Sequence, residues 1–245
     1  VTFKVTITDG TYTQSYFVPV LLNPDYVNIA INDVATTITS KGKIGWNADG
    51  ATTGLGFSYL GTQLLYEAGI MIGSSATKVS DCVRGTTAGT SDADFGNLIV
   101  AQKVGPTVSD FDAYTRYNDA PASPTQNLVI RQNAYAWTSA GSRKFVICEY
   151  ILVNNGSTTL NTGYAGIFAD WDIDAATYGQ NKADYDFTRF MGYSWYSGAA
   201  GKYAGIKLLT TSAAASYYAI DNAGSGRGGI NITSAYNTAD KYSTL

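Results

Sequence analysis

The chain has 245 residues, of which 45% are hydrophobic and 14% are charged, and its formal net charge is −3. This composition excludes intrinsic disorder and allows a sizeable core. A weakly acidic chain lacks the concentrated basic surface that nucleic acid requires, so no nucleic acid is expected as a partner. The sequence contains no run of about 20 apolar residues, and we expect no transmembrane segment.

The chain contains no histidine, and this restricts its chemistry. Ser-His-Asp and Cys-His nucleophilic sites need an imidazole, as do zinc sites of the HExxH type. The two glutamates, Glu67 and Glu149, leave acid–base chemistry mainly to aspartates. We therefore expect no catalytic residue in this chain and predict that it is not an enzyme. A glycosidase with paired aspartates is the remaining enzymatic alternative.

Residues 1–22 have the pattern of a β-hairpin. VTFKVTIT alternates apolar and polar positions, Asp9-Gly10 supplies the turn, and YTQSYFVPVLL returns. Asn23-Pro24-Asp25 then breaks the pattern, as an interdomain junction would. We predict that residues 1–23 are the terminal hairpin of an immunoglobulin-like module and that residues 24–245 form a β-sandwich domain. Because a lone hairpin is marginally stable in water, the alternative is that it packs on the residues that follow.

From Tyr26 onward the sequence consists of short β-like segments separated by glycine-rich turns. The clearest long strands are NLVIRQNAYAWT (127–138) and SRKFVICEYILVNNG (142–156). Turn signals recur at roughly 8–12 residues and no βαβ alternation is present. We predict an all-β fold, an antiparallel β-sandwich or a jelly-roll-like arrangement, with a short helix within TSAYNTADKYSTL (233–245).

The segment YAGIFADWDID (164–174) begins as an apolar strand and ends with aspartates at alternate positions. Residues two apart in an extended chain share one face, and dense carboxylates are the ligands that calcium prefers. Two further aspartates follow the next loop and could join them. The candidate Ca²⁺ ligands are Asp170, Asp172, Asp174, Asp184 and Asp186. The alternative is that these aspartates cap turns and that Arg189 supplies the counter-charge.

Aromatic side chains suggest a second kind of site. The candidates for stacking on sugar rings are Trp46, Trp137, Trp195 and Tyr196. Packing in the interior of a sandwich is the alternative use of such side chains. The two cysteines, Cys82 and Cys148, could form a disulfide in an oxidising compartment or remain as two buried thiols.

Several stretches resemble a known family. They are NPDYVNIAINDVATTITSKGKIGW, GFSYLGTQLLYEAGIMIGSSATKVSDCVRG, YAGIFADWDID and YYAIDN, within residues 23–222. They resemble the non-catalytic C-terminal β region of large secreted bacterial subtilisin-like serine peptidases, whose precursors carry immunoglobulin-like modules and a sorting signal. The resemblance implies an extracellular or cell-surface location, with neighbouring domains of the same precursor as partners. The catalytic motifs of subtilases are absent, so a peptidase active site would lie outside these residues.

Three functions follow from these patterns. The first is a non-catalytic accessory, binding or spacer module of a secreted or cell-surface multidomain protein. The second is a carbohydrate-binding module with a polysaccharide as its partner, which requires a surface row of coplanar aromatic rings. The third is a structural subunit of an extracellular fibre or surface layer, assembled with copies of itself by strand exchange, since an open hairpin offers unpaired edges.

Overall fold

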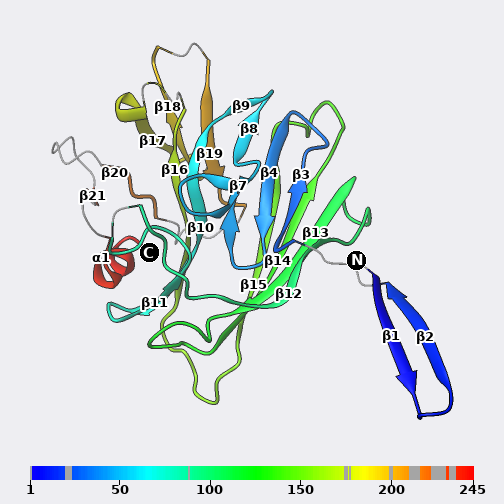
Figure 1. The fold of residues 1–245 in the computed structure, drawn as a ribbon. Helices are drawn as coiled ribbons and strands as arrows, with labels where there is room; N and C mark the ends of the chain where they lie inside the picture. The colour runs from blue at the N-terminus through cyan, green and yellow to red at the C-terminus, as the bar shows by residue number, and fades with distance from the viewer. Residues whose placement is uncertain are drawn as a thin grey trace.

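The structure, a computed structural model, describes residues 2–19, 24–87, 89–173, 176, 178–198, 201–209, 216–221, 230–231 and 236–245. Within these residues nearly all regular structure is β (Figure 1). The strands pair antiparallel except for one short pair, β20 and β21, which is parallel. The predicted all-β antiparallel sandwich is confirmed.

The larger sheet of the sandwich is built around β10. Its strands are β3 (Tyr26–Ile29), β4 (Val34–Thr39), β5 (Lys43–Ile44), β8 (Phe57–Tyr59), β9 (Thr62–Gln63), β10 (Leu65–Ser75), β11 (Lys78–Asp81) and β16 (Tyr164–Trp171). They follow the order β11-β10-β5-β4-β8-β9, while β16 pairs with β10 and β3 pairs with β4. The strand β10 therefore connects the acidic segment β16 to the rest of the sheet.

The second sheet packs on the first and closes the core. Its strands are β12 (Gly96–Lys103), β13 (Phe111–Asn118), β14 (Leu128–Ala136) and β15 (Ile147–Asn154), paired in sequence order. Ile70 of β10 packs in one buried cluster with Tyr117 and Ile130 of this sheet. Ile38 of β4 packs in a second cluster with Ala134. The inward residues of both sheets thus form the interior of a sandwich.

A third, smaller sheet follows β16. It consists of β17 (Lys182–Asp186), β18 (Met191–Trp195) and β19 (Tyr203–Lys207), preceded by the 3₁₀ turn η1 (Tyr178–Gln180). Ala204 of β19 is buried in a cluster with Leu64 and Ile173, so one face of this sheet packs on the domain. Two short pairs complete the strands: β6 (Trp46–Ala48) with β7 (Thr52–Gly54), and β20 (Ile220–Asp221) with β21 (Ile230–Asn231).

The N-terminal hairpin is confirmed as β1 (Thr2–Thr8) and β2 (Thr13–Pro19), which form a sheet of their own. Asp9 Oδ1 accepts hydrogen bonds from the N–H groups of Thr11 and Tyr12 at 2.9 and 2.7 Å, which fixes the turn. Figure 1 shows the hairpin extending away from the sandwich. The immunoglobulin-like module and the boundary between residues 23 and 24 stay predictions.

The predicted C-terminal helix is confirmed as α1 (Thr238–Ser243). The Asn237 side chain caps its start by accepting from the N–H groups of Ala239 and Asp240. Lys241 points from this helix into the protein and is buried. Across the described ranges, no helix has the length and apolarity needed to cross a bilayer.

Candidate functional site

The acidic end of β16 is neutralised by an arginine. The register of β10 and β16 places Glu67 directly opposite Asp170. Arg84 bonds both carboxylates, with Nε 3.2 Å from Glu67 Oε1 and Nη2 2.9 Å from Asp170 Oδ2. Burial raises the pKa of Glu67 even though Arg84 acts to lower it. Of the predicted calcium ligands, Asp170 therefore already has a counter-charge, which the chain itself supplies.

Among the described residues, the other predicted calcium ligands do not converge with Asp170 into a group of three carboxylates that could hold an ion. Asp172 follows the end of β16, and burial, followed by the charge of Asp170, raises its pKa to about 6. Asp184 accepts from the hydroxyl of Tyr193 at 3.4 Å. Asp186 accepts from Thr188 and pairs with Arg189, and these bonds lower its pKa to about 2. Asp174 lies outside the described residues. Calcium binding by this set stays a prediction, while the turn-capping alternative describes Asp186.

Three other carboxylates do converge. Asp81, Asp92 and Asp94 bring one oxygen each to within 4.8 Å of one another, a group with the donor chemistry of a metal site. A protein cation already faces two of them, because Lys241 Nζ lies 2.7 and 2.8 Å from the oxygens of Asp81 and 2.8 Å from Asp92. These carboxylates raise the pKa of Lys241 above its ordinary value, against the opposing effect of burial. The arrangement is an internal ion-pair network that fixes α1.

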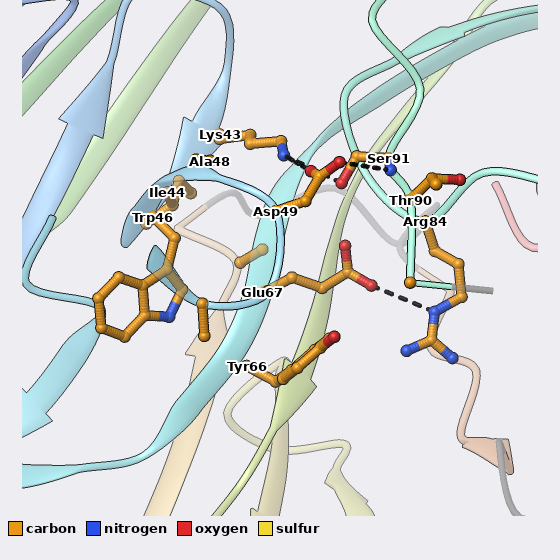
Figure 2. A pocket seen from close by; sticks show the side chains of 14 residues that line it. Lys43, Ile44, Trp46, Ala48, Asp49, Tyr66, Glu67, Arg84, Thr90 and Ser91 are labelled. Carbon is orange, nitrogen blue, oxygen red and sulfur yellow. Dashed lines mark hydrogen bonds and ion pairs between the residues drawn. The ribbon is translucent and has the colours of Figure 1, made fainter. Parts of the chain in front are cut away.

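A pocket lies between the β5–β7 segment and β10, and Figure 2 shows the side chains around it. Lys43 Nζ pairs with Asp49 at 2.5 Å and donates to the Ser91 hydroxyl at 2.9 Å. Glu67 and Arg84 form the opposite side. None of the buried polar atoms that lack a partner among the described residues lines this pocket. The charged side chains Lys43, Glu67 and Arg84 of this lining are therefore already paired with other residues of the chain.

The four predicted sugar-stacking residues divide between packing and exposure. Trp46 lines the pocket, and its Nε1–H donates to the carbonyl oxygen of Leu65 at 2.9 Å. Trp137 packs between Tyr135 and Phe145, with ring planes tilted by 38° and 59°. Tyr196 packs against the cluster around Leu64 and Ile173. These three side chains mainly hold elements together.

Trp195 belongs to a row of rings on β18 and β19, which we call the aromatic face: Tyr193, Trp195 and Tyr203. The register sets Trp195 directly opposite Tyr203, and the alternation of β18 places Tyr193 on the same side. The Trp195 and Tyr203 rings are 6.3 Å apart and 20° from parallel. Tyr193 lies 5.5 Å from Trp195 at 32°. The side chain of Tyr203 is 61% exposed.

The sequence pattern indicated Trp195 but missed Tyr193 and Tyr203. Tyr193 could have been found from its spacing of two from Trp195, since both belong to MGYSW. Tyr203 could not have been found from the sequence, because its position beside Trp195 depends on how β18 and β19 pair across a loop. Gly205 lies opposite Tyr193, where an added Cβ would come within 2.8 Å of the tyrosine Cβ. The absence of a side chain there leaves room for the Tyr193 ring.

Both cysteines are free thiols in the structure, so of the two alternatives the unbonded one is found. Cys82 packs in the cluster around Ile70, and Cys148 packs against the cluster around Ile38. Burial raises the pKa of Cys148 to about 12 and that of Cys82 well above its ordinary value. Neither thiol has the depressed pKa of a reactive cysteine.

The aromatic face differs from the charged clusters, because Tyr203 is open to solvent whereas Arg84 and Lys241 already pair with the carboxylates around them. Comparisons were made with models of protein families, with curated proteins and with solved structures. No significant match to this chain was found in any of the three.

Proposed function

We propose that this chain is a non-catalytic binding module of an extracellular or cell-surface protein and that its ligand is a polysaccharide. The observation that carries the proposal is the aromatic face, in which Trp195 and Tyr203 present near-parallel rings on an open sheet. The subtilase-like precursor that the sequence resemblance implies remains part of the proposal.

The chemistry of the aromatic face suits sugars. One face of a pyranose ring carries C–H groups and packs on an aromatic ring, while the hydroxyl groups at its edge need polar partners. The Asp184 carboxylate lies directly opposite Tyr193 and can accept from such hydroxyls. Because the aromatic rings form an open row and not an enclosed pocket, we expect them to bind internal sugar units of a long polysaccharide in preference to its end.

The test is binding of the intact chain to cellulose, chitin, xylan and polygalacturonate. Pull-down measures binding to the insoluble polymers, and affinity electrophoresis measures binding to the soluble ones. We expect binding to at least one of them. Trp195→Ala and Tyr203→Ala should each weaken that binding roughly tenfold, which corresponds to about 1.4 kcal/mol. Both positions are at the surface of β18 and β19, and circular dichroism checks that each variant is folded.

The matched control is Trp137→Ala, because this half-buried tryptophan also packs in an aromatic group but lies directly after β14 of the second sheet. It should leave binding unchanged. The proposal is wrong if neither these four polymers nor heparin, a sulfated polysaccharide, binds. It is also wrong if the Trp195→Ala/Tyr203→Ala double variant, shown to be folded, binds as tightly as the parent chain.

The hairpin favours a second candidate function, assembly with copies of this chain. The register of β1 and β2 puts Phe3, Val5 and Ile7 on the same face as Tyr16 and Val18. Each of these side chains is at least 43% exposed. Packing the same apolar face of two copies together would remove this surface from water, which stabilises an association.

Light scattering of the intact chain tests assembly through the hairpin. Ile7→Asp would place a charge on the apolar face and should dissociate any oligomer. Thr6→Asp adds the same charge to the opposite face of the same strand and should not. A parent chain that is monomeric at all concentrations excludes this second function without affecting the first.

A further inference from the structure

Two lysines extend the aromatic face. Lys182 of β17 lies directly opposite Trp195, and Lys207 of β19 lies opposite Met191, two positions from Tyr193 on the same side of β18. Both lysines are exposed. Within the described ranges, no carboxylate lies within ion-pair distance of either ammonium group. These charges are available to a ligand.

The acidic groups on this side of the sheet do not cancel the lysines. Asp186 is already paired with Arg189, and the two together carry no net charge. Asp184 is the remaining carboxylate on the side of β17 that faces Tyr193. Among the described residues of β17–β19 on this side, Lys182 and Lys207 carry two positive charges and Asp184 carries one negative charge, which leaves one net positive charge, whereas the whole chain carries −3. The aromatic face is therefore a local cationic surface on an acidic protein.

We propose that the polysaccharide bound by the aromatic face is anionic, carrying carboxylate or sulfate groups along its chain. The inference rests on the proposed function. A sugar ring stacked on Trp195 brings a substituent at its edge to the neighbouring position of Lys182, where an anionic group gains an ion pair that a neutral sugar cannot form. The net charge of the remaining surface repels such a polymer, so orientation onto this face is also favoured.

The experiment compares affinities of the intact chain for polygalacturonate, heparin and a neutral xylan without glucuronic acid side groups, at 50 and 500 mM NaCl. The two anionic polymers distinguish carboxylate from sulfate. We expect at least one of them to bind roughly tenfold tighter than xylan at low salt, with the difference largely lost at high salt. The Lys182→Gln/Lys207→Gln variant should lose roughly that tenfold preference.

The matched control is Lys78→Gln/Lys144→Gln, which makes the same charge change at exposed positions outside the aromatic face. It should retain the preference. The inference is overturned if xylan binds as tightly as both anionic polymers, or if the two double variants behave alike. In either case, sensitivity of the remaining binding to Trp195→Ala would show that the proposed function itself holds. If no polymer binds, both proposals fail.

Discussion

Arg84 decides the electrostatics of the acidic strand end. Glu67 and Asp170 lie opposite each other with side-chain exposures of 16% and 19%, where two carboxylates would repel strongly. The guanidinium group can bond two carboxylates at once because its donors are fixed in a plane. Burial nevertheless raises the pKa of Glu67, which means that desolvation outweighs the attraction of Arg84. Burying Glu67 and Asp170 together therefore costs free energy, and the Arg84 side chain offsets part of this cost.

The raised pKa of Asp172 predicts that the free energy of unfolding depends on pH. Its pKa is about 6 in the folded chain against an ordinary 3.8, mainly because of burial. A raised carboxyl pKa means that the folded state favours the protonated form, so this group destabilises the fold increasingly as pH rises from about 4 to above 6. Asp172→Asn mimics the protonated form. After allowance for solvent screening at this half-buried position, the variant should gain about 1 kcal/mol of unfolding free energy at pH 7.5.

Urea denaturation at pH 4 and pH 7.5 measures this effect. The gain from Asp172→Asn should be confined to the higher pH, where the native carboxyl group is ionised. Asp25→Asn at an exposed position serves as the control and should change neither value. An equal gain at both pH values, or a loss at pH 7.5, would contradict the raised pKa of Asp172.

At the scale of elements, α1 is held by its buried lysine. Lys241 is 1% exposed and its ammonium group bonds both oxygens of Asp81, which is equally buried. The helix has only six residues, too few to be stable by itself. It is also anchored by Leu245 against the glycine positions of β10 and β16, where a Cβ at Gly73 or Gly166 would come within 2.8 or 3.0 Å of the leucine.

Removing the ammonium group should therefore be strongly destabilising. Lys241→Met leaves the Asp81 carboxylate buried without its cation, and the loss of one partner of a buried pair costs about 3–5 kcal/mol. Chemical denaturation at pH 7 measures the loss. Lys78→Met, an exposed lysine on β11, should cost little. The Asp81→Asn/Lys241→Met variant should recover part of the stability, and a double variant no better than the sum of the single ones would refute the pairing.

The elements themselves were largely predictable, whereas their partners were not. Alternation and glycine turns predicted the hairpin, the long strands β14 and β15, and the C-terminal helix, because these signals are local. The strand in YAGIFADWDID was expected to continue through Asp174 but ends at Trp171, where the Asp172 N–H bonds the Leu64 carbonyl oxygen instead. Arg84 is 86 positions from Asp170, and no local pattern could indicate that pairing.

At the scale of the whole molecule, the fold decides which aromatic residues are accessible. The sandwich uses one side of each sheet for the core, so most of the tyrosines and tryptophans that suggested sugar binding are used in packing. The small sheet β17–β19 differs, because within the part of the chain that the structure describes its buried cluster is on the Ala204 side. Its other side keeps the rings of Trp195 and Tyr203 in contact with solvent. The composition indicated aromatic stacking, but the layer arrangement selected the residues.

The reactivity of the two thiols, Cys82 and Cys148, measures unfolding of the whole sandwich. Cys82 and Cys148 pack in two different clusters, both between the large sheets, and burial raises the pKa of each thiol. Cys82 is buried and Cys148 is half-buried, and their raised pKa values leave almost no thiolate near neutral pH, so neither residue should react quickly until the two sheets separate. We expect no fast labelling by 5,5′-dithiobis(2-nitrobenzoic acid) in buffer, and we expect two reactive thiols per chain in denaturant without reductant.

The labelling rate in buffer should follow the population of the globally unfolded state, and destabilisation by Lys241→Met should accelerate the labelling of both residues together. Fast labelling of one thiol in buffer would mean that its cluster opens locally, and no reaction in denaturant would mean that the two cysteines are bonded.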